Sequence, residues 1–478
     1  MHQAEMVFNG IDGASGGYLL ASLTPAQIVA LARGEPLDRE EQAALQVRHE
    51  QTLDGAGVAE NVEDPTDLAQ AGWGAIFAAG ADPAVREALA PLLDHRRAQA
   101  TPRDERFYQE YTGEDGYQPG ESTVRFLARH GAGPGPADPR NVPYYLLIVG
   151  DPEAIPYRFQ YQLDVQYAVG RLHFDTLDEY ASYARTVVGA EGVIGRTTPC
   201  RATFFGVRNA GDRATELSAE YLVAPLAEAV AGAFPEWQVE TVLAEAASKA
   251  RLAGLLGGAE TPSLLFTASH CLGFPHDDGR QRDHQGAILC QDWPGPRAWR
   301  GPIPPAHYFS ADDVSTDIGA GAGLGGLVAF VFGCFGAGTP HLDSFAHETT
   351  GERQALAPHA FVARLPQRLL GHPRGGALAV VGHVDRAWSY SYAWYEAGAQ
   401  LGVFESALQR LMKGYPVGYA MEYFDERYAE LSTLIAAELE EMRYGYEPDE
   451  WELAGLWTAN NDARGYVIVG DPAVRLGR

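Results

Sequence analysis

A histidine and a cysteine each follow a short apolar run in this sequence. LLFTAS precedes His270, and LVAFVFG precedes Cys334 later in the chain. Turn residues bound both runs, which is typical of strands buried on both faces of a parallel sheet. If the two strands are neighbours, an imidazole and a thiol meet at the carboxyl edge of the sheet, where ligands bind in open α/β sheets. Cysteine nucleophilic catalysis requires that pairing.

The residues around the cysteine suit a nucleophile. Cys334 lies in the glycine-rich stretch GCFGAGTP, and glycines permit a tight turn and leave N–H groups free to face an oxyanion. We expect the amides of Cys334 and of Cys271, which follows His270, to form an oxyanion hole. Taken alone, Cys334 is more typical of a small buried side chain, and His270 is more typical of a hydrogen-bonded residue at a sheet edge. The placement of both at the ends of two strands favours a catalytic role over these structural roles.

Alternating strands and helices must position these residues. From residue 200 onward, apolar runs alternate with amphipathic helical patterns, which predicts an α/β fold with a mostly parallel sheet and helices on both faces. An earlier α/β layer contains the strand YYLLIV at residues 144–149, and the chain ends in helical patterns and the strand GYVIV. We predict a docking or regulatory segment at 1–60, a first α/β subdomain at 61–196 and a catalytic subdomain with a helical C-terminal part at 197–478.

Composition narrows the functional classes. The chain has 478 residues, 36 Lys and Arg, 63 Asp and Glu, and a net charge of −27. A surface this acidic repels phosphate backbones, so nucleic-acid binding is not expected, whereas basic peptides are attracted. The sequence shows no membrane span and no signal peptide, and its four cysteines are too few for a disulfide framework. These features predict a cytoplasmic protein without membrane partners.

The two motifs together resemble those of the caspase-like cysteine peptidases. A strand ending in Ser-His and a strand ending in Cys within a Gly-rich turn are similar to the gingipain type and to bacterial caspase-like (CHAT-type) domains. YYLLIVGDPEAIPYRF, DVQYAVGRL and GYVIVGDPAVRL add to the resemblance, which covers about residues 140–390 and the last dozen. It implies the caspase-hemoglobinase fold with two subdomains, and an endopeptidase in which Cys334 attacks the carbonyl carbon and His270 protonates the leaving amine.

The resemblance also implies roles for acidic residues. Asp164 stands where gingipain-like relatives hold a basic substrate residue, which implies cleavage after Arg or Lys; a solvated carboxylate is the alternative. Asp151 and Glu153 are candidates to orient His270, although an aspartate in a GDP turn commonly caps that turn. Where the family usually has glycine after the histidine, this chain has Cys271, which puts a Cβ in the substrate's path and could pair oxidatively with Cys334.

Other residues give weaker evidence of a functional role. Trp388 and Tyr390 are candidates for a pocket wall, with core packing as the alternative. The histidines and cysteines between 270 and 290 lack zinc-ligand spacing, so no metal or cofactor is expected. We expect a protein or peptide as substrate and a regulatory protein as a further partner. Two other functions stay open: an inactive caspase-fold interaction module, and another cysteine-dependent hydrolase or acyltransferase.

Overall fold

The computed structural model describes residues 7–20, 24–34, 62–192, 200–257, 260–315, 324–347, 353–394 and 397–476. Its centre is a ten-stranded sheet, and the predicted α/β fold with a mostly parallel sheet is confirmed. In spatial order the strands are β3 (Tyr108–Tyr111), β2 (Trp73–Phe77), β4 (Tyr145–Val149), β5 (Ala168–Leu172), β20 (Tyr466–Gly470), β17 (Ala379–His383), β12 (Val328–Phe332), β8 (Leu264–Ala268), β6 (Arg201–Gly206) and β7 (Gln238–Leu243).

The sheet reverses direction once. Neighbouring strands are parallel throughout, except that β17 and β20 pair antiparallel, with Ala379 opposite Gly470. The half from β3 to β20 therefore runs opposite to the half from β17 to β7. As a result, the carboxyl ends of β12 and β8 share an edge with the amino ends of β4 and β5.

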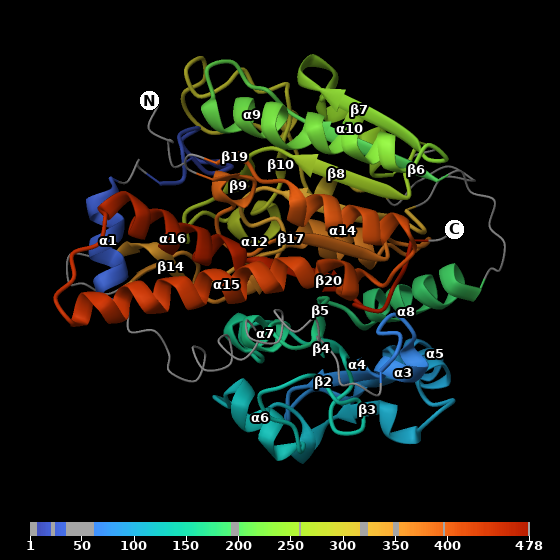
Figure 1. Cartoon of the computed structure of the whole chain (residues 1–478). Coiled ribbons are helices and arrows are strands. Elements are labelled where there is room, and N and C mark those ends of the chain that lie inside the picture. Colours follow the sequence, from blue (N-terminus) through green and yellow to red (C-terminus); the bar gives the residue numbers. More distant parts are fainter. Residues whose placement is uncertain are drawn as a thin grey trace.

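The inner strands of this sheet consist mostly of apolar residues, and their side chains are buried on both faces of the sheet, as is typical of a parallel sheet. Longer helices cover the sheet: α5 (Ala90–Ala100), α8 (Leu177–Gly192), α10 (Ala224–Ala233), α14 (Gly402–Met412) and α15 (Val417–Arg443), and α16 (Glu450–Ala463) packs on α15. Figure 1 shows α10, α14 and α15 across the face of the sheet turned to the viewer, where α15 contacts β5 and β20.

The helical segment after β6 forms as three continuous pieces. They are α9 (Arg213–Ser218), a π-helical turn (Ala219–Val223) and α10. Pro225 has no N–H to donate and lies in the first turn of α10, so the hydrogen-bond pattern shifts before it. Ser310 and Asp313 form a capping box on a single 3₁₀ turn, Ala311–Asp313.

Shorter elements surround this frame. They are α3 (Leu68–Ala71), α4 (Pro83–Ala88), α6 (Thr123–Arg129), α7 (Tyr157–Asp164), α11 (Lys249–Leu255), α12 (Gln281–His284), α13 (Arg364–Leu370) and the strand pairs β13 (Gly338–Thr339) with β16 (Phe361–Val362), β14 (Leu342–His347) with β15 (Arg353–Ala355), and β18 (Ala393–Trp394) with β19 (Gly398–Ala399). Within the described ranges, no helix is both long and apolar enough to cross a membrane.

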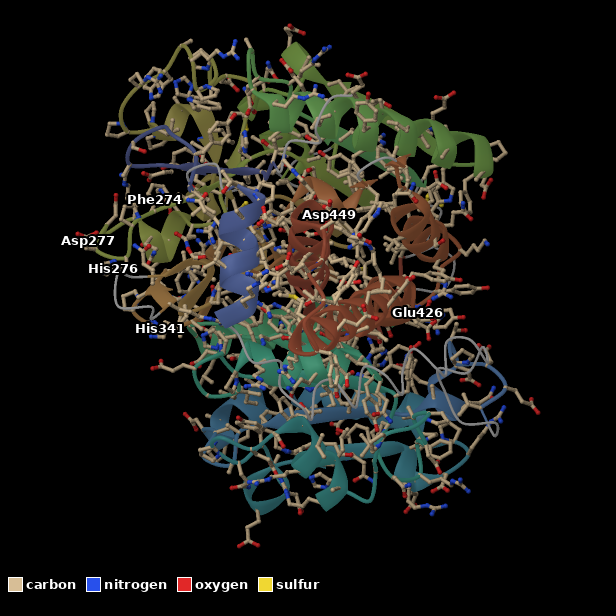
Figure 2. The ribbon with its side chains drawn as sticks, turned by 60° about the vertical axis from the view of Figure 1, so that its left-hand side comes forward. Phe274, His276, Asp277, His341, Glu426 and Asp449 are labelled. Atoms are coloured by element: carbon tan, nitrogen blue, oxygen red, sulfur yellow. The ribbon has the colours of Figure 1, made fainter. Side chains whose placement is uncertain are left out.

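A second sheet bridges the start of the chain and the loop after β8. Its order is β1 (Gly10–Asp12), β9 (Cys271–Gly273), β10 (Ile288–Leu289) and β11 (Tyr308–Phe309). The next helix along the chain from β1 is α1 (Pro25–Gly34), which packs on α16. Figure 2 shows α1 in blue beside α16, the helix that begins after Asp449. Residues 1–6, 21–23 and 35–60 of the predicted 1–60 segment lie outside the described residues.

Candidate active site

His270 and Cys334 come from adjacent strands. β8 and β12 are parallel, with Ala268 opposite Phe332, and each candidate residue lies two positions beyond this pair. They therefore lie at the same edge of the sheet. Both side chains are completely buried.

The turn around the cysteine depends on close backbone contacts. A Cβ on Gly333 would lie 2.5 Å from Cys271 Sγ and 2.9 Å from the Ser269 carbonyl oxygen, so only glycine fits before Cys334. Phe335 and Asp385 both have left-handed backbones, with φ of 60° and 85°, and the Phe335 amide donates to the Asp385 carbonyl at 2.7 Å. Such strained residues concentrate at functional sites.

Two backbone amides converge on one carbonyl oxygen beside the thiol. The Cys334 N–H donates to the Asn9 carbonyl oxygen at 3.0 Å, and the Cys271 N–H donates to the same oxygen at 3.1 Å. These are the two amides that the sequence analysis assigns to an oxyanion hole, and their distances suit that role. The occupant is a peptide carbonyl of the chain's own N-terminal segment, which we define as residues 7–20.

Asp212 orients the histidine. Its Oδ2 lies 2.6 Å from His270 Nε2, and both side chains are buried. Asp212 also caps α9 by accepting from the Thr215 amide and hydroxyl. Although burial by itself would raise the pKa of Asp212, His270 and these hydrogen bonds hold it well below its usual range. A carboxylate at Nε2 leaves Nδ1, which has no hydrogen-bond partner among the described residues, as the proton-accepting atom.

This geometry corrects the prediction that Asp151 or Glu153 orients His270. Asp151 accepts from the amides of Glu153 and Ala154 in a local turn at the carboxyl end of β4. Because the sheet reverses between β20 and β17, that end lies at the opposite edge from His270. Four strands, β5, β20, β17 and β12, also separate β4 from β8.

The signal for Asp212 was present in the sequence. GDRATELS follows the apolar strand RATFFGV, so Asp212 is an N-cap candidate just beyond a third strand end, next to the strand ends that lead to His270 and Cys334. A search limited to strands that end in His or Cys does not find it. Asn9 offers no comparable signal, because its partners are hundreds of residues away.

The thiol is shielded and protonated in this arrangement. Burial raises the pKa of Cys334, and the amide of Ala387 and the Arg386 charge offset only part of that rise. Arg386 is itself neutralised by two bonds to Asp343, each of 2.7 Å. Burial raises the pKa of the Cys271 thiol as well. All four cysteines of the chain are free.

The N-terminal segment contributes to this burial. A Cβ on Gly10 would lie 2.7 Å from Cys334 Sγ, which places Gly10 directly against the sulfur. Tyr18 packs its ring edge-on to His270, with centroids 5.9 Å apart, and its hydroxyl donates to Asp212 Oδ1 at 2.5 Å. The segment therefore contacts every group of the candidate site.

Asp164 lies elsewhere on the same edge. It ends α7 and lines a small cavity with Asp425, Met421 and Tyr466, while β20 and β17 separate β5 from β12. Burial and, second, the Asp425 carboxylate raise the pKa of Asp164 well above its usual range. Burial and the neighbouring Asp425 both disfavour the charged form of Asp164, which is the form that would hold a basic substrate residue.

The two candidate wall residues have different surroundings. Trp388 packs on Phe8 of the N-terminal segment, with ring centroids 5.1 Å apart, and on Phe345 at 4.7 Å. Tyr390 packs on Trp394 within the same apolar cluster. Trp388 thus combines a place in the core with a place beside Asn9.

Comparison with known proteins shows structural relatives alone. No family model matches the sequence, and no curated protein matches it either. The structure is similar to one described as that of a protease, with a TM-score of 0.47 and 11% identity, covering 89% of this chain and 80% of the other. It is also similar to the Arg-specific cysteine proteinase gingipain R, with a TM-score of 0.44, 11% identity, and coverages of 87% and 80%.

A third structure, the complex of the pro- and mature domains of RgpB from Porphyromonas gingivalis, gives a TM-score of 0.47 at 11% identity, with coverages of 85% and 79%. All three similarities have TM-scores below 0.5 and concern the fold alone. What the site does must be argued from its own geometry.

Proposed function

We propose that this protein is a caspase-like cysteine endopeptidase with Cys334 as nucleophile and His270 as proton carrier. The observation that supports this most is the convergence of the Cys334 and Cys271 amides on one peptide carbonyl beside the thiol. That arrangement stabilises negative charge on a carbonyl oxygen while sulfur attacks its carbon. Asp212 is a positioning residue that acts through the histidine.

The reaction proceeds in two steps. The thiol proton passes to His270 Nδ1, sulfur bonds to the carbonyl carbon, and the peptide C–N bond breaks as the proton is given to the leaving amine. Water then adds to the thioester and releases a carboxylic acid and the free thiol. The replacement of glycine by Cys271 is compatible with these steps, because its N–H still points to the carbonyl.

Two finer features have support of different weight. Four free cysteines suit a reducing compartment such as the cytoplasm. For cleavage after Arg or Lys, the net charge of −27 attracts basic peptides to the surface as a whole but does not set which residue precedes the cleaved bond, and the position of Asp164 next to Asp425 adds no support.

A peptidyl acyloxymethyl ketone, which alkylates an activated thiol, tests the proposal. We expect mass spectrometry to find modified Cys334 in the wild-type chain on long incubation and none in His270→Ala. Cys290, also buried, and the partly exposed Cys200 serve as internal controls for non-specific reaction. Labelling of Cys200 without Cys334 would contradict the proposal.

One observation favours a second function. Cys334 is fully covered, as expected for an inactive caspase-fold module that binds partners rather than substrates. Such a module would leave Cys334 unlabelled by the ketone even after the N-terminal segment is displaced.

A further inference from the structure

We propose that residues 7–12 are bound as the enzyme's own substrate, with the Asn9–Gly10 peptide bond in the reacting position, and that the enzyme cuts this bond and selects asparagine before the bond it cleaves. This inference rests on the proposed function. It concerns which peptide bond the site accepts and what occupies the site before activation.

Main-chain pairing holds the segment on both sides of that bond. Before it, the Asn9 amide donates to the Ala387 carbonyl at 3.0 Å, and the Ser389 amide donates to the Val7 carbonyl at 2.9 Å, an antiparallel pairing. After it, Gly10, Ile11 and Asp12 pair in parallel with Cys271, Leu272 and Gly273. An extended peptide held between two strands is a common mode of substrate and peptide recognition.

The bond between these two pairings is the one that meets the reactive groups. The Asn9 carbonyl oxygen takes both amides of the oxyanion hole, and Gly10 lies against Cys334 Sγ. The structure thus places the carbonyl carbon of Asn9 next to the sulfur and the nitrogen of Gly10 in the position of a leaving group.

The side-chain pocket holds a short amide by its N–H₂ end, whereas Asn9 Oδ1 has no hydrogen-bond partner among the described residues. Asn9 is completely buried, and its Nδ2 lies 3.5 Å from Ser218 Oγ. The Ser218 hydroxyl donates to the Thr215 carbonyl, so its oxygen turns a lone pair toward Asn9. A lone pair accepts from an amide N–H₂ and repels the carboxylate of an aspartate. Ser218 is therefore the specificity-determining residue that we assign.

The two pieces of the chain that cleavage of the Asn9–Gly10 bond would produce are held by different numbers of contacts outside the site. Residues from Gly10 onward stay bound through the β1–β9 pairing, through Tyr18 on Asp212, and through α1 on α16 (Figure 2). Residues before Gly10 have the pairing with 387–389 and the contact of Phe8 with Trp388. Cleavage lets this shorter piece leave, which empties the pocket of Asn9.

The cleavage balances with water as the second reactant. The Cys334 sulfur bonds to the Asn9 carbonyl carbon, the C–N bond to Gly10 breaks, and the thiol proton passes through His270 to the Gly10 amine. Water then cleaves the thioester, which leaves a carboxyl group on Asn9 and a proton on Cys334.

Two readouts test this inference. Mass spectrometry of the purified wild-type chain should reveal a new N-terminus at Gly10, which Cys334→Ala and Asn9→Ala should lack; Cys334→Ala also controls for spontaneous chemistry at an Asn–Gly bond. In trans, hexapeptides Val-Phe-Xaa-Gly-Ile-Asp should be cut by wild type and by Gly10→Ala about 10-fold or more faster with Asn than with Asp, Ala or Arg. Ser218→Ala should reduce the Asn preference mainly through KM.

The outcomes separate this inference from the proposed function. Faster cleavage of the Arg peptide would overturn the selectivity and leave a cysteine peptidase. A wild-type chain that stays uncut while Asn peptides are cleaved would overturn self-cleavage. If no peptide is cut and the ketone leaves Cys334 unmodified, both proposals fall.

Discussion

Removing the Tyr18 hydroxyl should make the covered Cys334 thiol more accessible. In Tyr18→Phe the ring is kept, but the hydrogen bond to Asp212 Oδ1, 2.5 Å long, is lost. Asp212 keeps its bonds to His270 and Thr215, both 2.6 Å, so the orientation of the histidine should not change. The substitution therefore acts mainly on the closed state of the N-terminal segment.

The size of the effect follows from the contact. A hydrogen bond to a charged group contributes about 1.5–3 kcal/mol. Tyr18 is 43% exposed, which lowers the value to about 1–2 kcal/mol because solvent competes for the same groups. The open fraction should rise about 5- to 30-fold, and the alkylation rate of Cys334 with it if closing is fast compared with alkylation.

Iodoacetamide labelling followed by peptide mass spectrometry measures this rate. Cys200, partly exposed and distant in the fold, reports reagent strength in the same sample. Tyr145→Phe is the matched control, because it removes a phenol bond to the Pro65 carbonyl far from the site. Equal Cys334 rates in Tyr18→Phe, Tyr145→Phe and wild type would refute the claim that the segment controls access.

Three further substitutions test named contacts. Gly10→Ala should raise Cys334 alkylation above wild type, since the new Cβ would lie 2.7 Å from the sulfur; an unchanged rate would contradict the placement of Gly10. Asp212→Asn should lower peptide turnover about 10²-fold or more, because an amide that donates to Nε2 leaves Nδ1 protonated. Because its folded-state pKa is lowered, Asp212 contributes stability above about pH 4 that is lost in acid, so the urea-measured gap between wild type and Asp212→Asn should shrink below that pH. Arg96→Met should reduce the free energy of unfolding in urea by about 3–5 kcal/mol, since Arg96 is buried against Asp471 and Glu191. Arg97 pairs with Glu110 but is half-exposed, so Arg97→Met should cost under about 1 kcal/mol. Similar losses for both variants would contradict this.

Local pattern predicted the frame of the site well. The apolar runs before His270 and Cys334 leave little choice but buried parallel strands, and neighbouring strands of the same direction bring their ends together. The amide of the residue after the histidine and that of the cysteine follow from this placement, since both belong to the turns that leave the sheet.

The reversal of the sheet was not predictable in the same way. The last strand, β20, inserts between β5 and β17 and joins two halves of opposite direction. No local pattern encodes where a terminal strand inserts. Asp151 therefore appeared to share an edge with His270, although the two lie at opposite edges.

The occupied site escaped prediction for a related reason. FNGID has the composition of a turn, and its pairing with Cys271 and with residues 387–389 depends on contacts remote in sequence. Asp212 differs, because its strand end and helix cap are local and could have been included.

The central claim is that His270 and Cys334 act as one unit on a peptide bond. Its most direct test is a double-mutant cycle of Cys334→Ala, His270→Ala and the pair, each in the Gly10→Ala chain, with turnover of a quenched fluorescent peptide that contains both an Asn and an Arg site. We predict that each single variant loses as much activity as the double variant, because groups that act together are not additive. Losses that simply multiply, or full turnover in either single variant, would contradict the account.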